Sequence, residues 1–162
     1  MKTIYLAGGC FWGVERYFSL AKGVVLTSVG YANGTKDNPS YEDLKHGDDD
    51  ASETVKIIYD EKIVSLEKLL EIYLRAIDPY SKNKQGEDEG VQYRTGIYYL
   101  DEDDHKIIID YLNKINLKNH QIEILPLRKF FLAEEYHQKY LEKNPHGYCH
   151  INFNLLKEDE RK

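Results

Sequence analysis

Hydrophobic residues recur along this chain at two spacings, every second residue in some segments and every third or fourth in others, which distinguish strands from helices. The strand-like segments are residues 2–7, 24–32, 53–60, 93–100 and 121–127. Helical spacing starts near Cys10 and recurs at residues 65–77, 101–115 and 133–144. The pattern predicts the element order β-α-β-β-α-β, followed by α-β-α.

The predicted helices have recognisable ends. Gly23 is a plausible stop for the first helix, and Pro145 for the last. Ser65 precedes the second helix in the position of an N-cap. The helix over 101–115 has an acidic start, which suits the positive end of the helix dipole. Its inward stripe is expected at Ile108, Tyr111, Leu112 and Ile115.

The first six elements match the split βαββαβ pattern, which predicts an α+β fold with helices on a mainly antiparallel, ferredoxin-like sheet. Residues 33–53 and 78–92 lack periodicity and are rich in polar and turn-forming residues, so long loops are expected there. Long loops in a compact domain are often functional. No repeat or linker divides the chain, so we expect one domain over 1–162, with an irregular tail from about 144.

The composition narrows the class of protein. The 162 residues are 41% hydrophobic and 31% charged, which is ordinary for a globular domain. A net charge of −6 gives no reason to expect nucleic acid or an anionic membrane as a partner. The sequence contains no run of about 18 apolar residues, so it predicts no membrane span. Because residues 1–9 do not resemble a signal peptide, we expect a cytoplasmic protein, whose two cysteines stay reduced.

Cys10 stands in the stretch "LAGGCFWGVERYF" (6–18), at the start of a predicted helix. The unpaired N–H groups of a first helical turn favour a thiolate, so we expect a lowered pKa for Cys10. Phe11 and Trp12 could wall a small apolar pocket beside the sulfur. The alternative is that Cys10 is a small buried hydrophobic residue and that both rings belong to the core.

Cys149 lies in "KNPHGYCHINF" (143–153), a segment with Pro and Gly outside regular structure. A thiol there could meet Cys10, as a resolving cysteine meets a nucleophile, or the two thiols could be unrelated. A metal site formed by Cys10, Cys149 and the two tail histidines is a third interpretation, but the spacing does not match known zinc motifs. His137 could be the base of a cysteine hydrolase, although nothing marks an oxyanion hole and a lone helical histidine usually packs or faces solvent.

Five blocks, in this order, resemble the peptide methionine-S-sulfoxide reductases of the A class. They are "GCFWG" (9–13), "GYANG" (30–34), "NPSYEDL" (38–44), "QGEDEGVQYRTGIYY" (85–99) and "FFLAEEYHQKYLEKNPHGYC" (130–149). The resemblance implies a two-layer α/β sandwich around a βαββαβ core. The sequence departs from the family pattern at Asp50, Ala51 and Ser52, where members usually carry Gly-His-Ala. It also has no cysteine after Cys149, where many members carry one.

The resemblance also implies roles. The catalytic residues would be the nucleophile Cys10, the acid Glu53, the hydroxyl donors Tyr41 and Tyr93, and the resolving Cys149. The substrate-binding residues would be Phe11 and Trp12 at the methyl group, and Asp88. Each could instead have no role, as a core aromatic, a solvated carboxylate or one of the 14 tyrosines.

The implied reaction is reduction of methionine-S-sulfoxide, free or in proteins, for protein repair and defence against oxidative stress. A Cys10 sulfenic acid would form, condense with Cys149 to a disulfide, and be recycled by thioredoxin. No metal or organic cofactor is expected, and the protein is expected to be a monomer. A binding module that recognises methionine sulfoxide without turnover is the alternative, which the presence of both cysteines disfavours.

Overall fold

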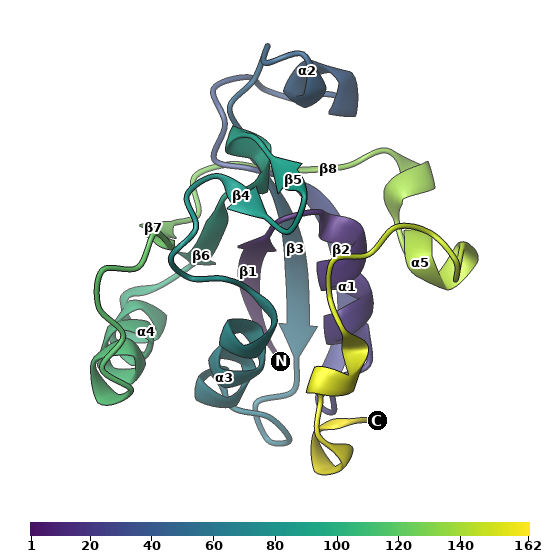
Figure 1. Cartoon of the computed structure of the whole chain (residues 1–162). Coiled ribbons are helices and arrows are strands. Elements are labelled where there is room, and N and C mark those ends of the chain that lie inside the picture. The colour runs from purple at the N-terminus through teal and green to yellow at the C-terminus, as the bar shows by residue number, and fades with distance from the viewer.

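The computed structural model describes all 162 residues as a mixed six-stranded sheet with five α-helices (Figure 1). The strands are β1 (Lys2–Gly8), β2 (Val24–Ala32), β3 (Ser52–Tyr59), β6 (Thr95–Tyr99), β7 (Glu123–Pro126) and β8 (Phe130–Leu132). The helices are α1 (Phe11–Ser19), α2 (Tyr41–Lys45), α3 (Leu66–Ala76), α4 (Glu102–Lys114) and α5 (Tyr140–Lys143). The predicted α+β class is confirmed.

The sheet has the strand order β7-β6-β1-β3-β2-β8. All neighbours are antiparallel except β6 and β7, which run parallel. The central strands β1 and β3 are buried along most of their length, and each has a paired strand at both edges. The main elements occur along the chain in the predicted order, namely β1, α1, β2, β3, α3 and β6. The main plan of the fold therefore follows from the hydrophobic pattern.

The helices α1 and α3 lie side by side on one face of the sheet (Figure 1), where the Tyr17 hydroxyl donates to the Ile72 carbonyl at 2.8 Å. Ser65 caps α3 as predicted, since its side chain accepts from the Lys68 N–H at 3.0 Å. In α4 the inward stripe is correct except for Ile115, which is 42% exposed. Ile115 is the C-cap residue, so the chain already turns away from the core there.

The two long segments contain short elements that the sequence did not predict. Residues 33–53 include α2, which begins with a capping box between Ser40 and Asp43. Residues 78–92 include a small hairpin of β4 (Lys84–Gln85) and β5 (Asp88–Glu89), followed by a 3-10 turn at Val91–Tyr93. The edge strand β8 was also missed. None of the helices combines the length and the apolar composition that a membrane span requires.

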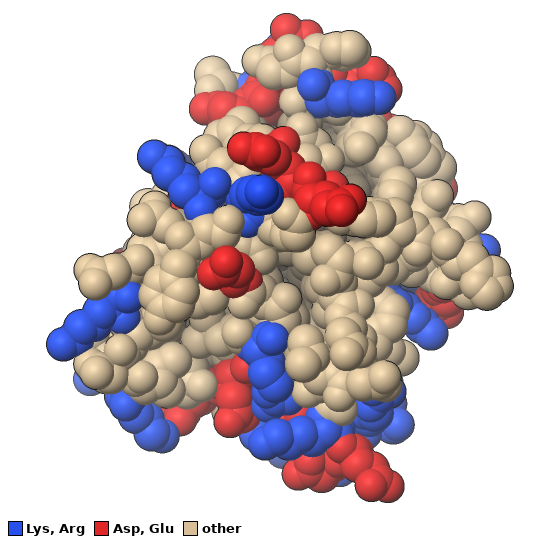
Figure 2. All heavy atoms as spheres, in the orientation of Figure 1, with Lys and Arg blue, Asp and Glu red and all other residues tan.

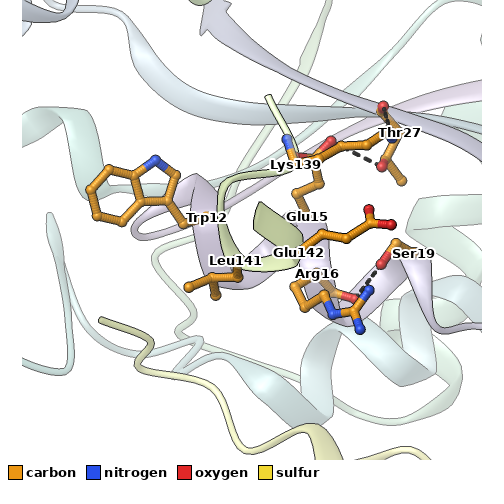
Figure 3. A pocket seen from close by; sticks show the side chains of 8 residues that line it. All are labelled: Trp12, Glu15, Arg16, Ser19, Thr27, Lys139, Leu141 and Glu142. Carbon is orange, nitrogen blue, oxygen red and sulfur yellow. Dashed lines mark hydrogen bonds between the residues drawn. The ribbon is translucent and has the colours of Figure 1, made fainter. Parts of the chain in front are cut away.

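The helix predicted over 133–144 is wrong. A 3-10 turn at Glu135–His137 and the four-residue α5 occupy it, separated by Lys139 in a left-handed conformation (φ 53°). The side chain of Gln138 binds the backbone N–H and carbonyl of Val29 at 2.9 Å, so this segment anchors to β2 instead of continuing a helix. Glu15, buried on α1, accepts from Lys139 N at 2.6 Å and from Thr27 at 2.9 Å (Figure 3).

The C-terminal segment crosses in front of α1 (Figure 1) and then packs against α3, where Lys68 and Arg75 both reach Glu160. There Glu160, which is 6% exposed, accepts two hydrogen bonds from the Arg75 guanidinium at 2.7 and 2.9 Å. The Arg75 hydrogen bonds lower the pKa of Glu160 to about 2. The stretch around Cys149 is therefore held between two anchors, at Gln138 and at Glu160.

Candidate active site

Cys10 occupies the N-cap position of α1, directly after β1 and the turn at Gly9. Gly9 has a φ of +87°, and a Cβ placed on it would meet the Gln85 side chain at 2.7 Å. Only glycine fits this turn, because it tolerates the left-handed conformation and the close approach of β4. The turn delivers Cys10 into the interior of the site, where the residue is 7% exposed.

The pKa of Cys10 is raised, which contradicts the sequence-based expectation of a lowered one. Burial is the main cause of the raised pKa, and the neighbouring Glu53 carboxyl adds to it. The N–H groups of Trp12 and Gly13 do lower the pKa, as a helix start should, but burial outweighs them. The substrate-free site therefore holds a protonated thiol.

Glu53 lies on β3, is 1% exposed and faces the start of α1. Its Oε1 accepts from the Phe11 N–H at 3.2 Å and its Oε2 from the Gln92 amide at 2.7 Å. Burial raises the pKa of Glu53 to about 8 although both hydrogen bonds act against that shift. A carboxylic acid thus keeps its proton near neutral pH, and it is hydrogen-bonded to the N–H of the residue that follows Cys10.

Tyr41, at the start of α2, and Tyr93, in the 3-10 turn, both belong to this cluster. Burial raises the pKa of Tyr41 to about 12 and raises that of Tyr93 further, with Glu53 the next cause and Cys10 a smaller one. Both hydroxyls therefore stay neutral hydrogen-bond donors. Glu134 holds α2 in place, because its Oε2 accepts from the Tyr41 N–H at 3.0 Å.

Asp88 lies on β5 at the rim of the same cluster, and its Oδ2 is buried without a hydrogen-bond partner. Its charge helps to raise the pKa values of Cys10 and of Glu53. Figure 2 shows acidic side chains gathered around the β4–β5 hairpin. An unpaired buried carboxylate oxygen is costly, which makes Asp88 a candidate acceptor for a ligand donor.

The two aromatic residues after Cys10 have different surroundings. Phe11 is 1% exposed and packs in the core against Tyr31 and His137, with ring centroids 5.8 and 5.2 Å apart. Trp12 is half-buried and stacks on Tyr140 at 3.8 Å. The indole N–H of Trp12 donates to His137 Nδ1 at 3.0 Å, so His137 orients Trp12. This contact favours the packing role for His137 over that of a hydrolase base.

Cys149 and Cys10 are both free thiols, and the structure brings Cys149 to the same face of α1. A Cβ placed on Gly13 would lie 2.8 Å from the Cys149 sulfur, so the glycine leaves room for that sulfur. Residues 10 and 13 are neighbours on one helix face, with Cβ positions about 5–6 Å apart. A Cys10–Cys149 disulfide would therefore require only a short movement. No group of three His, Cys, Asp or Glu side chains is arranged to hold a metal ion.

Two site features were not predicted from the sequence. Gln92 holds the acid Glu53, and its place beside Tyr93 was the available signal. The loop before Glu53 departs from the family pattern, and Asp50 anchors it. The Asp50 carboxylate accepts from both the N–H and the hydroxyl of Thr35 at 2.8 Å, and Arg94 donates to the Asp50 carbonyl at 2.8 Å.

The site fits the class of thiol-dependent oxidoreductases. It combines two thiols with a protonated carboxyl and two neutral hydroxyls. The comparisons with known proteins agree with this class. Residues 2–162 match the family described as peptide methionine sulfoxide reductase. The chain belongs to the peptide methionine sulfoxide reductase family, as its five sequence blocks predicted, and it is an enzyme that reduces methionine sulfoxide.

Two relatives and two solved structures illustrate the similarity. The chain is 58% identical to the peptide methionine sulfoxide reductase MsrA of Lachnoclostridium phytofermentans, covering 93% of this chain and 92% of that one. It is 55% identical to MsrA of Clostridium acetobutylicum, covering 97% and 99%. Mxr1 from Saccharomyces cerevisiae in reduced form superposes with a TM-score of 0.84 at 37% identity, covering 92% and 88%. Methionine sulfoxide reductase A of Corynebacterium diphtheriae gives 0.81 at 37%, covering 91% and 77%.

Proposed function

We propose that this chain is a single catalytic domain on a ferredoxin-like βαββαβ core, and that it reduces the S epimer of methionine sulfoxide with Cys10 as nucleophile. The observation that carries the proposal is Glu53, a buried acid with a pKa near 8 that is hydrogen-bonded to the first N–H of the Cys10 helix. A sulfoxide oxygen must be protonated as its sulfur is attacked, and Glu53 holds a proton for that step.

The first half-reaction balances without any cofactor. The Cys10 sulfur bonds to the sulfoxide sulfur while Glu53 delivers its proton to the sulfoxide oxygen. The protonated oxygen then transfers from the substrate sulfur to the Cys10 sulfur. The substrate S–O bond and the transient S–S bond both break, a new S–O bond makes Cys10 a sulfenic acid, and methionine leaves. The proton from the Cys10 thiol restores Glu53 to its acid form. Tyr41 and Tyr93 donate hydrogen bonds to the oxygen as charge develops on it.

Recognition of the substrate rests on three distinct surroundings. Trp12, held by His137 and Tyr140, offers an aromatic face for the methyl group, with Phe11 behind it. The free Oδ2 of Asp88 offers an acceptor for an N–H of the substrate backbone. The oxygen faces the acid and the two hydroxyls. Because methyl, oxygen and chain each have a separate place, only one epimer can present its sulfur to Cys10.

The second half-reaction is proposed for Cys149, whose sulfur lies against Gly13, one turn from Cys10. Cys149 also lines an open hollow of about 410 Å³ with Arg16, Pro145 and Phe153 among its walls. A disulfide at Cys149 would thus face an incoming dithiol, for which we propose thioredoxin. A solved structure describes Mxr1 from Saccharomyces cerevisiae in complex with Trx2. We further propose a cytoplasmic monomer that accepts free and protein-bound methionine sulfoxide.

Separate assays with the S and R epimers of methionine sulfoxide, with dithiothreitol as reductant, test this function. We expect turnover of the S epimer and less than about one hundredth of that rate with the R epimer, as expected for a site that misplaces the reacting atoms. Equal turnover of both epimers would contradict the proposed pocket. Binding without any turnover would instead support a recognition module.

A further inference from the structure

His150, the residue after Cys149, has one ring nitrogen with a partner and one without. Its Nε2 lies 2.8 Å from the carbonyl oxygen of Gly8. A carbonyl only accepts, so Nε2 carries the hydrogen of the neutral ring and Nδ1 keeps a free lone pair. Nδ1 is buried and has no hydrogen-bond partner. A buried nitrogen with an unused lone pair indicates a task that the resting structure leaves unfilled.

The imidazole of His150 lies in a space that glycines open beside the two thiols. A Cβ on Gly13 would meet the Cys149 sulfur at 2.8 Å and His150 Nδ1 at 3.6 Å, so both atoms border the same point on α1. A Cβ on Gly9, the residue before Cys10, would meet His150 Nε2 at 3.1 Å. The free nitrogen therefore borders the space through which the Cys149 sulfur reaches Cys10.

The thiol of Cys149 needs a proton acceptor. Burial raises the pKa of Cys149, so little thiolate exists near neutral pH. Its sulfur lies 3.3 Å from the N and O atoms of Ile151, and a carbonyl oxygen cannot take up a proton at this pH. Burial lowers the pKa of His150, so its ring is neutral and can accept one. The ionisable groups near the ring include Asp88, which acts against that shift, and the Cys149 thiol. The Tyr148 hydroxyl lies near His150 as well, beside Gly86.

We propose that His150 accepts the proton of Cys149 when that thiol attacks the sulfenic acid on Cys10. The Cys149 sulfur bonds to the Cys10 sulfur, the S–O bond of the sulfenic acid breaks, and the proton held on Nδ1 leaves with the departing oxygen as water. One sulfenic acid and one thiol give one disulfide and one water, so no further oxidant is needed. The inference rests on the proposed resolving role of Cys149.

The experiment measures two steps separately after one equivalent of methionine-S-sulfoxide is added without reductant. Methionine release reports attack by Cys10, and mass spectrometry of quenched, alkylated samples reports the disulfide. His150→Gln keeps an amide N–H for the Gly8 carbonyl but removes the basic nitrogen, and His150→Asn provides a second variant without a base. The matched control is His146→Gln, an exposed histidine of the same tail.

In His150→Gln, methionine release should keep its rate while disulfide formation slows by about tenfold or more at pH 7, a loss expected for a missing base. Its disulfide rate should rise about tenfold per pH unit, because only thiolate then reacts, and the wild type should rise less steeply. Unchanged disulfide rates and pH slopes in both variants would overturn the role of His150 alone. A wild type that releases methionine but never forms the disulfide would overturn the role of Cys149 and, with it, this inference.

Discussion

Replacement of Glu53 by Gln tests the acid of the site most sharply. Glu53→Gln keeps the shape of the side chain, and its oxygen can still accept from the Phe11 N–H. The neighbouring Gln92 amide can rotate to accept from the new amide group. The variant therefore loses the transferable proton and little else.

The structure sets the size of the expected effect. With a pKa of about 8, Glu53 is about 90% protonated at pH 7, whereas an ordinary value of 4.5 would leave about 0.3%. Burial thus raises the amount of acid by a factor of about 300. Removing a general acid costs about 10²–10⁴-fold in rate, which is about 3–5 kcal/mol of transition-state stabilisation. We expect this loss in the rate of methionine release.

The pH dependence has a defined sign. The wild-type rate of sulfenic acid formation should lose the contribution of the acid as the pH rises through about 8, falling about tenfold per unit above it. Glu53→Gln should lack this fall. The free energy of unfolding depends on pH in the same direction. The Glu53 carboxyl has a higher pKa in the folded chain than in the unfolded chain, so its contribution to stability is complete below about pH 4.5 and is lost as the pH rises to about 8. Near neutral pH the variant should be as stable as the wild type, or more stable by about 1–3 kcal/mol.

Single-turnover release of methionine, followed by rapid quench from pH 5 to 10, is the assay. The matched control is Glu15→Gln, which removes an equally buried carboxyl of α1 whose pKa is also raised by burial. The control should stay within about threefold of the wild-type rate, since Glu15 anchors the chain at Lys139 and does not line the site. A near-normal rate in Glu53→Gln would refute the reasoning and leave protonation to the tyrosines.

Four further outcomes are expected. In Cys149→Ser, one methionine per enzyme should still be released, but turnover with thioredoxin should stop. Dithiothreitol should restore part of the turnover. Full thioredoxin-dependent turnover would exclude Cys149 as the resolving residue. In the reduced, substrate-free protein, iodoacetamide should label the half-buried Cys149 before Cys10 at pH 7, because burial protects Cys10 and raises its pKa. Peptide mapping that shows Cys10 labelled first would contradict the protection of Cys10 by burial. Gly13→Ala should slow disulfide formation by about 10–100-fold without slowing methionine release, because the new methyl group displaces the Cys149 sulfur. Equal effects on both steps would argue against a specific contact between residue 13 and Cys149. Glu160→Gln should lower the free energy of unfolding at pH 7 by about 1–2 kcal/mol in denaturant titrations. Because the pKa of Glu160 is lowered to about 2, that difference should shrink as the pH falls from about 4.5 towards 2, and a constant difference would contradict the ion pair with Arg75.

The main elements of the fold could be predicted from the sequence because their signals are local. The alternation over 53–60 and the apolar stripe and N-cap of 65–77 gave β3 and α3 within a residue or two. The segment over 133–144 also has helical spacing, yet its backbone is held by contacts with Val29 and Glu15, which are more than 100 residues away in sequence. Such long-range hydrogen bonds leave no periodic signal.

The residues of the candidate site were proposed through the family resemblance, but their electrostatics required coordinates. The position of Cys10 at a helix start was correct, and the expected direction of its pKa shift was wrong, because sequence does not report how deeply β1 and α1 bury the sulfur. The same burial makes Glu53 an acid. The contact between Gly13 and Cys149 likewise depends on how the tail packs, which the composition of the tail does not determine.

The most direct test of the account uses the reduced wild-type protein with one equivalent of methionine-S-sulfoxide and no reductant. The account predicts one equivalent of methionine, the loss of two hydrogens from the intact mass, and a single disulfide between Cys10 and Cys149 in the peptide map. Release of methionine with both thiols still free to alkylate, or a disulfide only between separate chains, would contradict it.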